Sequence, residues 1–193
     1  MGWPEYRRDL LAVDFDANRV LDRYFHSGES AAFWQADPEE EPTFKRLLAQ
    51  ELRHAFGLEL HPFQLIVCGS AHLGFSPVPK KLGNPFNPVE SDIDVAVVSS
   101  ELFDRWWTEL QQSEQVPVAL PRVAEDLFWG FINPVNVNSI SEIGRKWWDV
   151  FGKLRTDRAK GVRGRLYRSY WSMQIYHKHA IDGGRKKLQG HRV

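Results

Sequence analysis

The chain has 193 residues, in which 25 Lys and Arg balance 25 Asp and Glu, so its formal net charge is zero. Apolar residues make up 42% of it, with 8 Trp and 12 Phe, which excludes a disordered or fibrous protein. No apolar run reaches the roughly 20 residues of a membrane helix, and the start of the chain lacks the apolar segment of a signal peptide. We therefore expect a soluble, cytoplasmic protein that acts at no membrane.

Charge is divided unevenly along the chain. Residues 144–193 hold 14 Lys and Arg against three Asp, a net charge of +11, which leaves −11 on residues 1–143. A basic carboxyl-terminal quarter is typical of a surface that faces a polyanion such as RNA. It is equally compatible with neutralisation of the acidic part within one fold, and the sequence leaves both interpretations open.

The first 60 residues are predicted to form helices. Residues 16–35 carry apolar side chains that suit one or two short helices, and an acidic turn follows at 37–42. A longer helix is predicted over 44–56, because apolar residues recur there every three or four positions. Thr43 is its expected N-cap and Gly57 its expected stop.

Two short buried strands are predicted next, at 63–68 and 92–98, since both runs are apolar and rich in β-branched residues. The 15 residues from 76 to 90 contain four prolines and are predicted to form a loop. Lys80 and Lys81 in this loop either reach phosphates or simply face solvent.

The second half of the chain is predicted to be mainly helical, with Ser100 capping the first of its helices. These helices are expected at 101–112, 121–129, 143–154 and from Leu166 to about Gly183. Residues 135–138 alternate apolar and amide side chains as in a short strand. The Arg and Lys run at 155–168 is interpreted as a helix face that contacts either phosphates or solvent.

These elements predict an α/β (α+β) fold in a single domain over residues 1–193. Its core is expected at about 43–140, and a basic helical part at about 141–193. Cys68, the one cysteine, is expected to be a small core residue, and its isolation excludes an intramolecular disulfide. The pairs Trp106-Trp107 and Trp147-Trp148 either stack on bases or, as large aromatics usually do, place one ring in the core.

Two carboxylates carry the clearest chemical signal. Asp92 and Asp94 begin the second strand, and residues two apart on a strand point to the same face. Carboxylates this close repel one another unless a cation lies between them, and oxygen ligands favour Mg²⁺ or Mn²⁺. At the end of the first strand, Gly69 lets the backbone approach a phosphate closely, and Ser70 offers an amide and a hydroxyl. Together these groups are typical of phosphoryl or nucleotidyl transfer.

The order of these motifs resembles the DNA polymerase beta-like nucleotidyltransferase superfamily over about residues 43–112. Those motifs are Gly69-Ser70 after an apolar strand, Gly74-Phe75-Ser76, and Ser91-Asp92-Ile93-Asp94 on the next strand. The resemblance implies a small mixed β-sheet flanked by helices, with helical extensions at both ends of the chain. It also implies catalytic, metal-binding roles for Asp92 and Asp94 with Mg²⁺ or Mn²⁺ as cofactor, and binding of a nucleoside triphosphate (NTP) at Gly69 and Ser70.

The resemblance further implies a third carboxylate on a later strand, which the sequence does not make evident. The candidates are Glu125, Asp126, Glu142 and Asp149, and none lies in an acid-bearing apolar strand. The strand predicted at 135–138 carries Asn136 and Asn138 instead, and an amide oxygen coordinates a metal without contributing charge.

We therefore expect a metal-dependent nucleotidyltransferase. It would move a nucleoside monophosphate from an NTP to a hydroxyl group of RNA, tRNA, a protein or a small molecule. The alternative is a catalytically inactive nucleotidyltransferase fold that binds nucleotide or RNA as a partner subunit, for example in a toxin–antitoxin or defence system. An acid within metal reach of Asp92 and Asp94 favours the enzyme, and an amide or an empty position favours the binding subunit. The sequence leaves open which NTP is used and the oligomeric state.

Overall fold

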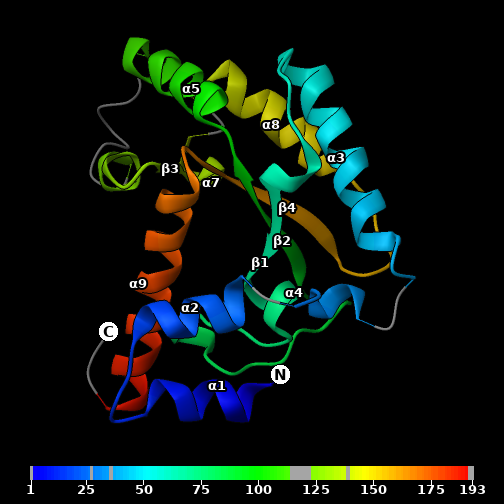
Figure 1. The fold of residues 1–193 in the computed structure, drawn as a ribbon. Coiled ribbons are helices and arrows are strands. Elements are labelled where there is room, and N and C mark those ends of the chain that lie inside the picture. Colours follow the sequence, from blue (N-terminus) through cyan, green and yellow to red (C-terminus); the bar gives the residue numbers. More distant parts are fainter. Residues whose placement is uncertain (1, 27, 35–36, 114–122, 138–139, 191–193) are drawn as a thin grey trace.

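A computed structural model describes residues 2–26, 28–34, 37–113, 123–137 and 140–190, and it has the mixed α+β architecture that the sequence predicts (Figure 1). Four strands form one sheet in the order β1-β2-β4-β3. Their bounds are Leu65–Cys68 for β1, Asp92–Val98 for β2, Phe131–Ile132 for β3 and Gly161–Tyr167 for β4. β2 runs antiparallel to β1 and parallel to β4, and β3 closes the other edge antiparallel to β4.

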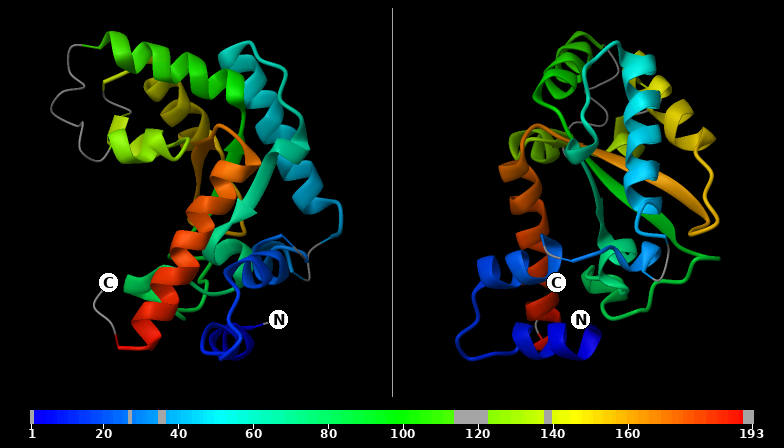
Figure 2. Two further views of the ribbon diagram at one scale, coloured as in Figure 1. Left: turned by 60° about the vertical axis from the view of Figure 1, so that its left-hand side comes forward. Right: turned by 45° about the vertical axis from the view of Figure 1, so that its right-hand side comes forward.

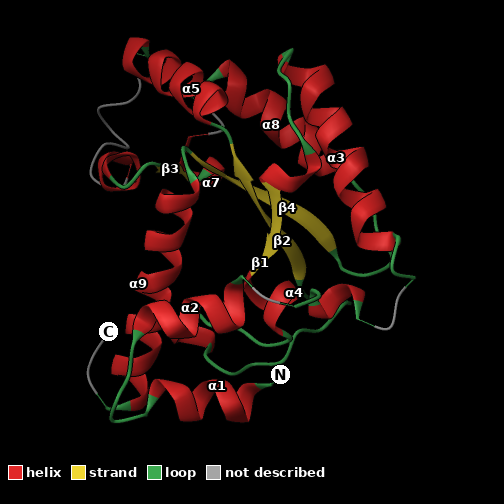
Figure 3. Cartoon of the chain, in the orientation of Figure 1, coloured by secondary structure: helices red, strands yellow, loops and turns green. Residues whose placement is uncertain are grey.

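Three helices cover one face of this sheet (Figure 3). They are α3 (Glu40–Phe56), α5 (Ser100–Gln112) and α8 (Glu142–Lys153). The inward residues Ile93, Val95 and Val97 of β2 pack with them in one large core cluster. Burial of each such side chain stabilises the fold by about 1.5–3 kcal/mol, so this face supplies most of the driving force.

The long helix α9 (Tyr170–Leu188) lies against part of the opposite face. Ala96 and Val98 of β2 and Tyr167 of β4 pack there against Met173 of α9. From the end of β4, α9 continues down to α1 (Trp3–Leu10) and α2 (Ala17–Phe25), as the two views of Figure 2 show. The amino-terminal parts of β2 and β4 lie beyond this cover.

Shorter elements complete the described chain. The helix α4 (Gly69–Leu73) follows β1 directly, and α7 spans Pro134–Val137. Residues 123–128 are also helical. Single 3₁₀ turns lie at Ala31–Phe33, Pro62–Gln64 and Pro79–Lys81. The last of these is within the segment that the sequence predicts to be a loop.

The strand β4 lies where the sequence predicts a basic helix, so that prediction is wrong. Val162 and Leu166 face the large core cluster, while Arg163 and Arg165 between them point to the other face. Gly164 is required because α8 packs directly on it: a Cβ there would lie 2.2 Å from Cζ of Phe151. The missed signal was an alternation with period two, interrupted by this glycine.

Three further sequence predictions need correction. Residues 135–138 were predicted as a strand, but Pro134–Val137 form the helix α7, with Pro134 at a position that suits the start of a helix. The helix α3 begins at Glu40, so Thr43 lies inside it rather than at its N-cap. The cap of α5 is Ser99, whose hydroxyl accepts a hydrogen bond from the Leu102 amide, and not Ser100. Gly57 ends α3 in the left-handed conformation, as predicted.

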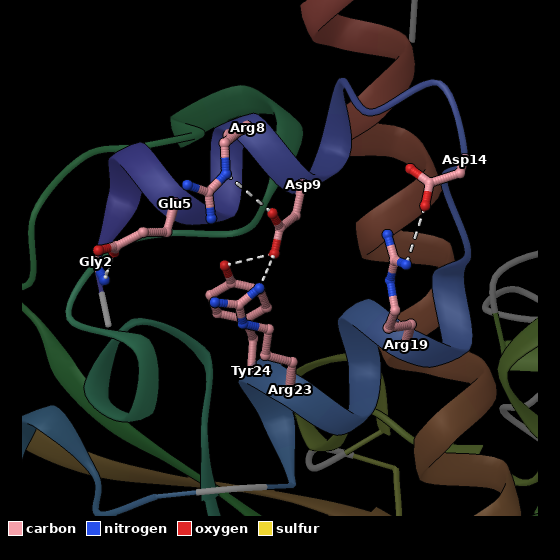
Figure 4. A network of polar contacts seen from close by, with 8 residues as sticks. All are labelled: Gly2, Glu5, Arg8, Asp9, Asp14, Arg19, Arg23 and Tyr24. Atoms are coloured by element: carbon pink, nitrogen blue, oxygen red, sulfur yellow. Dashed lines mark hydrogen bonds and ion pairs between the residues drawn. The ribbon is translucent and has the colours of Figure 1, made fainter.

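The two amino-terminal helices are joined by one carboxylate. Asp9 of α1 accepts hydrogen bonds from Arg23, at 2.8 Å, and from the hydroxyl of Tyr24, at 2.9 Å, both on α2 (Figure 4). The ring of Tyr24 also meets that of Tyr6 edge-on, with centroids 5.0 Å apart. This pair of helices forms a second core with Ile181 of α9, which confirms a helical extension at the start of the chain.

A buried histidine lies where α9 meets α2. His177 is 5% exposed, its ring centroid is 4.9 Å from that of Phe25, and its Nδ1 has no hydrogen-bond partner among the described residues. Burial, aided by the charges of His26 and Arg165, lowers the pKa of His177 to about 3. The folded protein therefore holds this imidazole neutral throughout the physiological range.

Because the unfolded chain protonates this histidine below its ordinary pKa of 6.5, the free energy of unfolding must fall as pH falls from 6.5 toward 3. Between pH 7 and pH 5 the loss from His177 is about 2 kcal/mol. We expect His177→Phe to lose correspondingly less stability over that interval in urea unfolding experiments. Equal slopes in wild type and His177→Phe would contradict this account.

Candidate functional site

The residues predicted as a site do come together at one end of the sheet. Since Ile93 and Val95 face the large core, Asp92 and Asp94 face the opposite side of β2. The strand pairing places Cys68 of β1 opposite Asp94, so Gly69 and Ser70 follow directly beside these carboxylates. This end of the face lies beyond the residues on which α9 packs.

Two glycines leave space next to the two carboxylates. Gly69 has a φ of +64°, and a Cβ built on it would lie 3.0 Å from Oδ2 of Asp94. On the other side, a Cβ on Gly161 of β4 would lie 3.1 Å from Oδ1 of Asp92. A side chain at either position would crowd an aspartate, and at Gly69 it would also strain the backbone. The glycines therefore keep both carboxylates open to a ligand.

Ser70 lies inside α4 rather than at its cap. The N-cap position belongs to Cys68, and no side chain caps this helix. The hydroxyl of Ser70 makes no hydrogen bond with the residues that the structure describes, although its carbonyl accepts one from the amide of Gly74. Ser70 is therefore not the residue that caps this helix.

Two arginines of β4 share the face with the aspartates. Arg163 is opposite Asp94 in the strand register, and Arg165 is opposite Ala96. Nε of Arg163 lies 2.6 Å from Oδ2 of Asp92. The guanidinium of Arg165 is stacked over the Tyr176 ring of α9, with its Cζ 4.3 Å from the ring centroid. Sequence reasoning included both arginines in a basic run that contacts either phosphates or solvent, but it did not place them beside the aspartates because it did not predict the strand β4.

The surroundings of Asp94 disfavour the charged form of its carboxyl group. Its side chain is accessible to solvent, yet it lies against enough protein that desolvation raises the pKa of Asp94 above the ordinary 3.8. Arg165 and Arg163 act in the opposite direction and Asp92 in the same one, and desolvation exceeds them. A cation arriving at this carboxylate would therefore be favoured.

No third carboxylate joins the pair within the part of the chain that the structure describes. In that part, no group of three or more His, Cys, Asp or Glu residues is arranged to hold a metal ion. Of the sequence candidates, Asp126 accepts a hydrogen bond from Asn136 at 3.4 Å, and Glu142 pairs with Lys146 at 2.9 Å. The position opposite Asp94 on the neighbouring strand holds Arg163 instead.

These residues still fit a metal ion that arrives with a ligand of its own. Asp92 and Asp94 offer two carboxylates on one face, and the space beside Gly69 and Gly161 admits further oxygen ligands. A triphosphate would bring such oxygens. Two carboxylates alone, with one of them already paired to Arg163, make a poor cage for a free ion.

Part of the positive charge of the basic carboxyl-terminal quarter is neutralised by ion pairs within the fold. Arg158 binds Glu40 through two hydrogen bonds of 2.7 and 2.6 Å. Arg168 pairs with Asp104 at 3.1 Å. Basic residues therefore neutralise acids from earlier in the chain, as one of the two sequence interpretations expected.

Cys68 and the tryptophans have structural roles. Burial, followed by the charge of Asp94, raises the pKa of Cys68 to about 12, so its thiol is not a nucleophile at neutral pH. Trp106 and Trp147 are buried in the core with ring centroids 5.5 Å apart, while Trp148 is 54% exposed. This confirms the expectation that one ring of each pair lies in the core.

Comparisons of the chain with protein family models, with curated proteins and with solved structures found no match. Among the described residues, every helix is too short or too polar to span a bilayer. The likeness to the superfamily named above is therefore one of motifs alone.

The raised pKa of Asp94 predicts a gain in stability when its charge is removed. The charged carboxylate destabilises the fold fully above its folded pKa and not at all below the ordinary value. Asp94→Asn should therefore melt at a higher temperature than wild type at pH 7, with a difference that narrows as pH falls toward 4. Asp14→Asn is a control of opposite sign, because Arg19 lowers the pKa of the exposed Asp14. A lower melting temperature for Asp94→Asn at pH 7 would refute the prediction.

Proposed function

We propose that this protein binds an NTP together with Mg²⁺ or Mn²⁺ at Asp92, Asp94, Gly69 and Ser70, and transfers its nucleoside monophosphate to a hydroxyl acceptor. The observation that carries the proposal is the meeting of the Gly69 turn with the paired aspartates, where Asp94 Oδ2 lies 3.0 Å from the Cβ position of Gly69. A phosphate-binding turn and two carboxylates at this distance are the groups that phosphoryl transfer needs.

Each group has a part in such a transfer. The amides of the Gly69 turn and the free hydroxyl of Ser70 would hold phosphate oxygens, and Asp92 and Asp94 would hold the metal ion. The metal ion supplies positive charge that screens the triphosphate. The acceptor oxygen bonds to the α-phosphorus, the bond from that phosphorus to the bridging oxygen breaks, pyrophosphate leaves, and the hydroxyl proton passes to solvent. RNA, protein and small-molecule hydroxyls are all open as acceptors.

A second candidate is favoured by Arg163. This arginine lies opposite Asp94 on β4, a strand later in the chain, and the superfamily resemblance implies a third carboxylate on a later strand. A cation there supports phosphate binding and does not help to activate an acceptor hydroxyl. The second candidate is therefore a domain that binds the metal–nucleotide complex without transferring it, as the partner subunit of another protein.

Transfer and binding are separable in one experiment. The protein is incubated with each α-labelled NTP, Mg²⁺ or Mn²⁺, and either total RNA or a cell lysate, and its melting temperature is measured with the same nucleotides. We expect label transfer, and a stabilisation of about 2.7 kcal/mol at a nucleotide concentration 100 times the Kd. Both effects should vanish in the Asp92→Asn, Asp94→Asn double variant.

The matched control is Asp104→Asn, since Asp104 also pairs with an arginine but lies on α5, outside the site. Metal-dependent stabilisation without any label transfer selects the second candidate. The absence of stabilisation by every metal–NTP combination overturns both.

Ser70 gives a sharper test of the phosphate site. Ser70→Ala removes one hydrogen bond to a charged group, which costs about 1.5–3 kcal/mol of binding free energy. We expect a ten- to hundredfold weaker affinity for the metal–NTP complex in titration calorimetry. The melting temperature without ligand should hardly change, because the hydroxyl has no partner among the described residues. A loss of stability with unchanged nucleotide affinity would contradict the assignment.

A further inference from the structure

The ion pair between Arg163 and Asp92 occupies the place where a metal ion would bind. Nε of Arg163 is 2.6 Å from Oδ2 of Asp92, and a guanidinium in that position repels a divalent cation. The pair also satisfies one of the two carboxylates that the site offers. The guanidinium of Arg163 therefore already neutralises Asp92.

The guanidinium of Arg163 can leave Asp92 at little cost in free energy. The side chain of Arg163 is 65% exposed and that of Asp92 is 21% exposed, so solvent reaches the pair mainly on the side of the arginine. Such screening weakens the attraction that holds the guanidinium at Asp92. Arg165, in contrast, is only partly exposed and is held against the Tyr176 ring, so it remains where it is. Of the two arginines on this face, Arg163 is the one whose guanidinium can move from a carboxylate to a nearby anion at little cost.

The neighbouring strand positions allow this exchange. Arg163 lies opposite Asp94 in the register, and Asp94 lies beside the Gly69 turn where phosphate would bind. A polyphosphate between the turn and the aspartates would be within reach of a long arginine side chain that starts from the adjacent strand. Arginine also binds phosphate through two parallel hydrogen bonds, a geometry that a single contact with Asp92 does not use.

We propose, resting on the function proposed above, that Arg163 is an exchangeable cation: it holds Asp92 when the site is empty and binds the polyphosphate of the nucleotide when the metal reaches Asp92. The protein consequently discriminates against the free metal ion and accepts the ion only with its nucleotide. Arg163 is then a substrate-binding residue and, at the same time, the residue that keeps free Mg²⁺ or Mn²⁺ out.

Two separate titrations test this exchange with the full chain. Binding of Mn²⁺ alone is followed by electron paramagnetic resonance, and binding of inorganic tripolyphosphate in the presence of saturating Mg²⁺ is followed by calorimetry. We expect Arg163→Gln to bind free Mn²⁺ about tenfold more tightly than wild type, because the competing cation is gone. The same variant should bind tripolyphosphate at least about tenfold more weakly, because the charge-assisted hydrogen bonds of the guanidinium to phosphate are lost.

Arg168→Gln is the matched control. Arg168 belongs to another arginine–aspartate pair, with Asp104, just after the same strand, so its loss should change neither titration. Arg163→Lys keeps the charge and loses the paired donors, so it should retain the exclusion of Mn²⁺ while weakening tripolyphosphate binding. Melting curves of all variants show that each is folded before it is titrated.

The outcomes distinguish this inference from the proposed function. Unchanged Mn²⁺ affinity in Arg163→Gln, with wild type still stabilised by Mg²⁺ and NTP, overturns the exchange and leaves the proposed function standing. Opposite changes in the two titrations, absent from Arg168→Gln, support it. If wild type binds no metal–nucleotide complex at all, the proposed function fails, and the exchange fails with it.

Discussion

The parallel pairing of β2 with β4 is the constraint on which the rest of the structure depends. It sets Arg163 opposite Asp94 and turns both toward the face that the large core does not use. A slip of one residue would reverse every side chain of β4 and turn Val162 and Leu166 toward the face that carries the site. The contact of α8 with Gly164 opposes such a slip, because no larger residue fits under Phe151. Packing on one face of the sheet therefore sets the positions of the charged side chains on the other face.

The site itself is shaped by missing side chains as much as by the charged ones. Gly69 and Gly161 each leave room for one aspartate, and they belong to opposite neighbours of β2. The aspartates are consequently accessible although β2 is a central strand of the sheet. Because this space is open, the carboxyl of Asp94 stays in contact with solvent. The protein around it still removes enough water to raise the pKa of Asp94. A ligand that brings its own cation can reach the accessible carboxyl, and its positive charge favours the charged form of Asp94.

The division of charge along the chain also has a tertiary explanation. Arg158, Arg163 and Arg168 each reach back to an acid from the first 143 residues. Because solvent reaches the arginine of each pair, these pairs make only a modest contribution to the stability of the fold. Their effect is local: they decide which carboxylates are already neutralised and which remain available. At Asp92 that choice determines whether a free metal ion or a metal–nucleotide complex is the better ligand.

The sequence by itself determined the two strands, the Gly69-Ser70 turn between them, and the shared face of Asp92 and Asp94. Each of these follows from local rules: apolar runs, glycine conformation and the two-residue period of a strand. Only the tertiary structure decided that residues 161–167 form a strand and not a helix. Their sequence mixes arginines with Gly164, and the need for a glycine there becomes clear only when α8 is seen to pack directly on it. The partner of Asp92 was likewise beyond local reasoning, since Arg163 is 71 positions away in the chain and is brought there by β-sheet pairing alone.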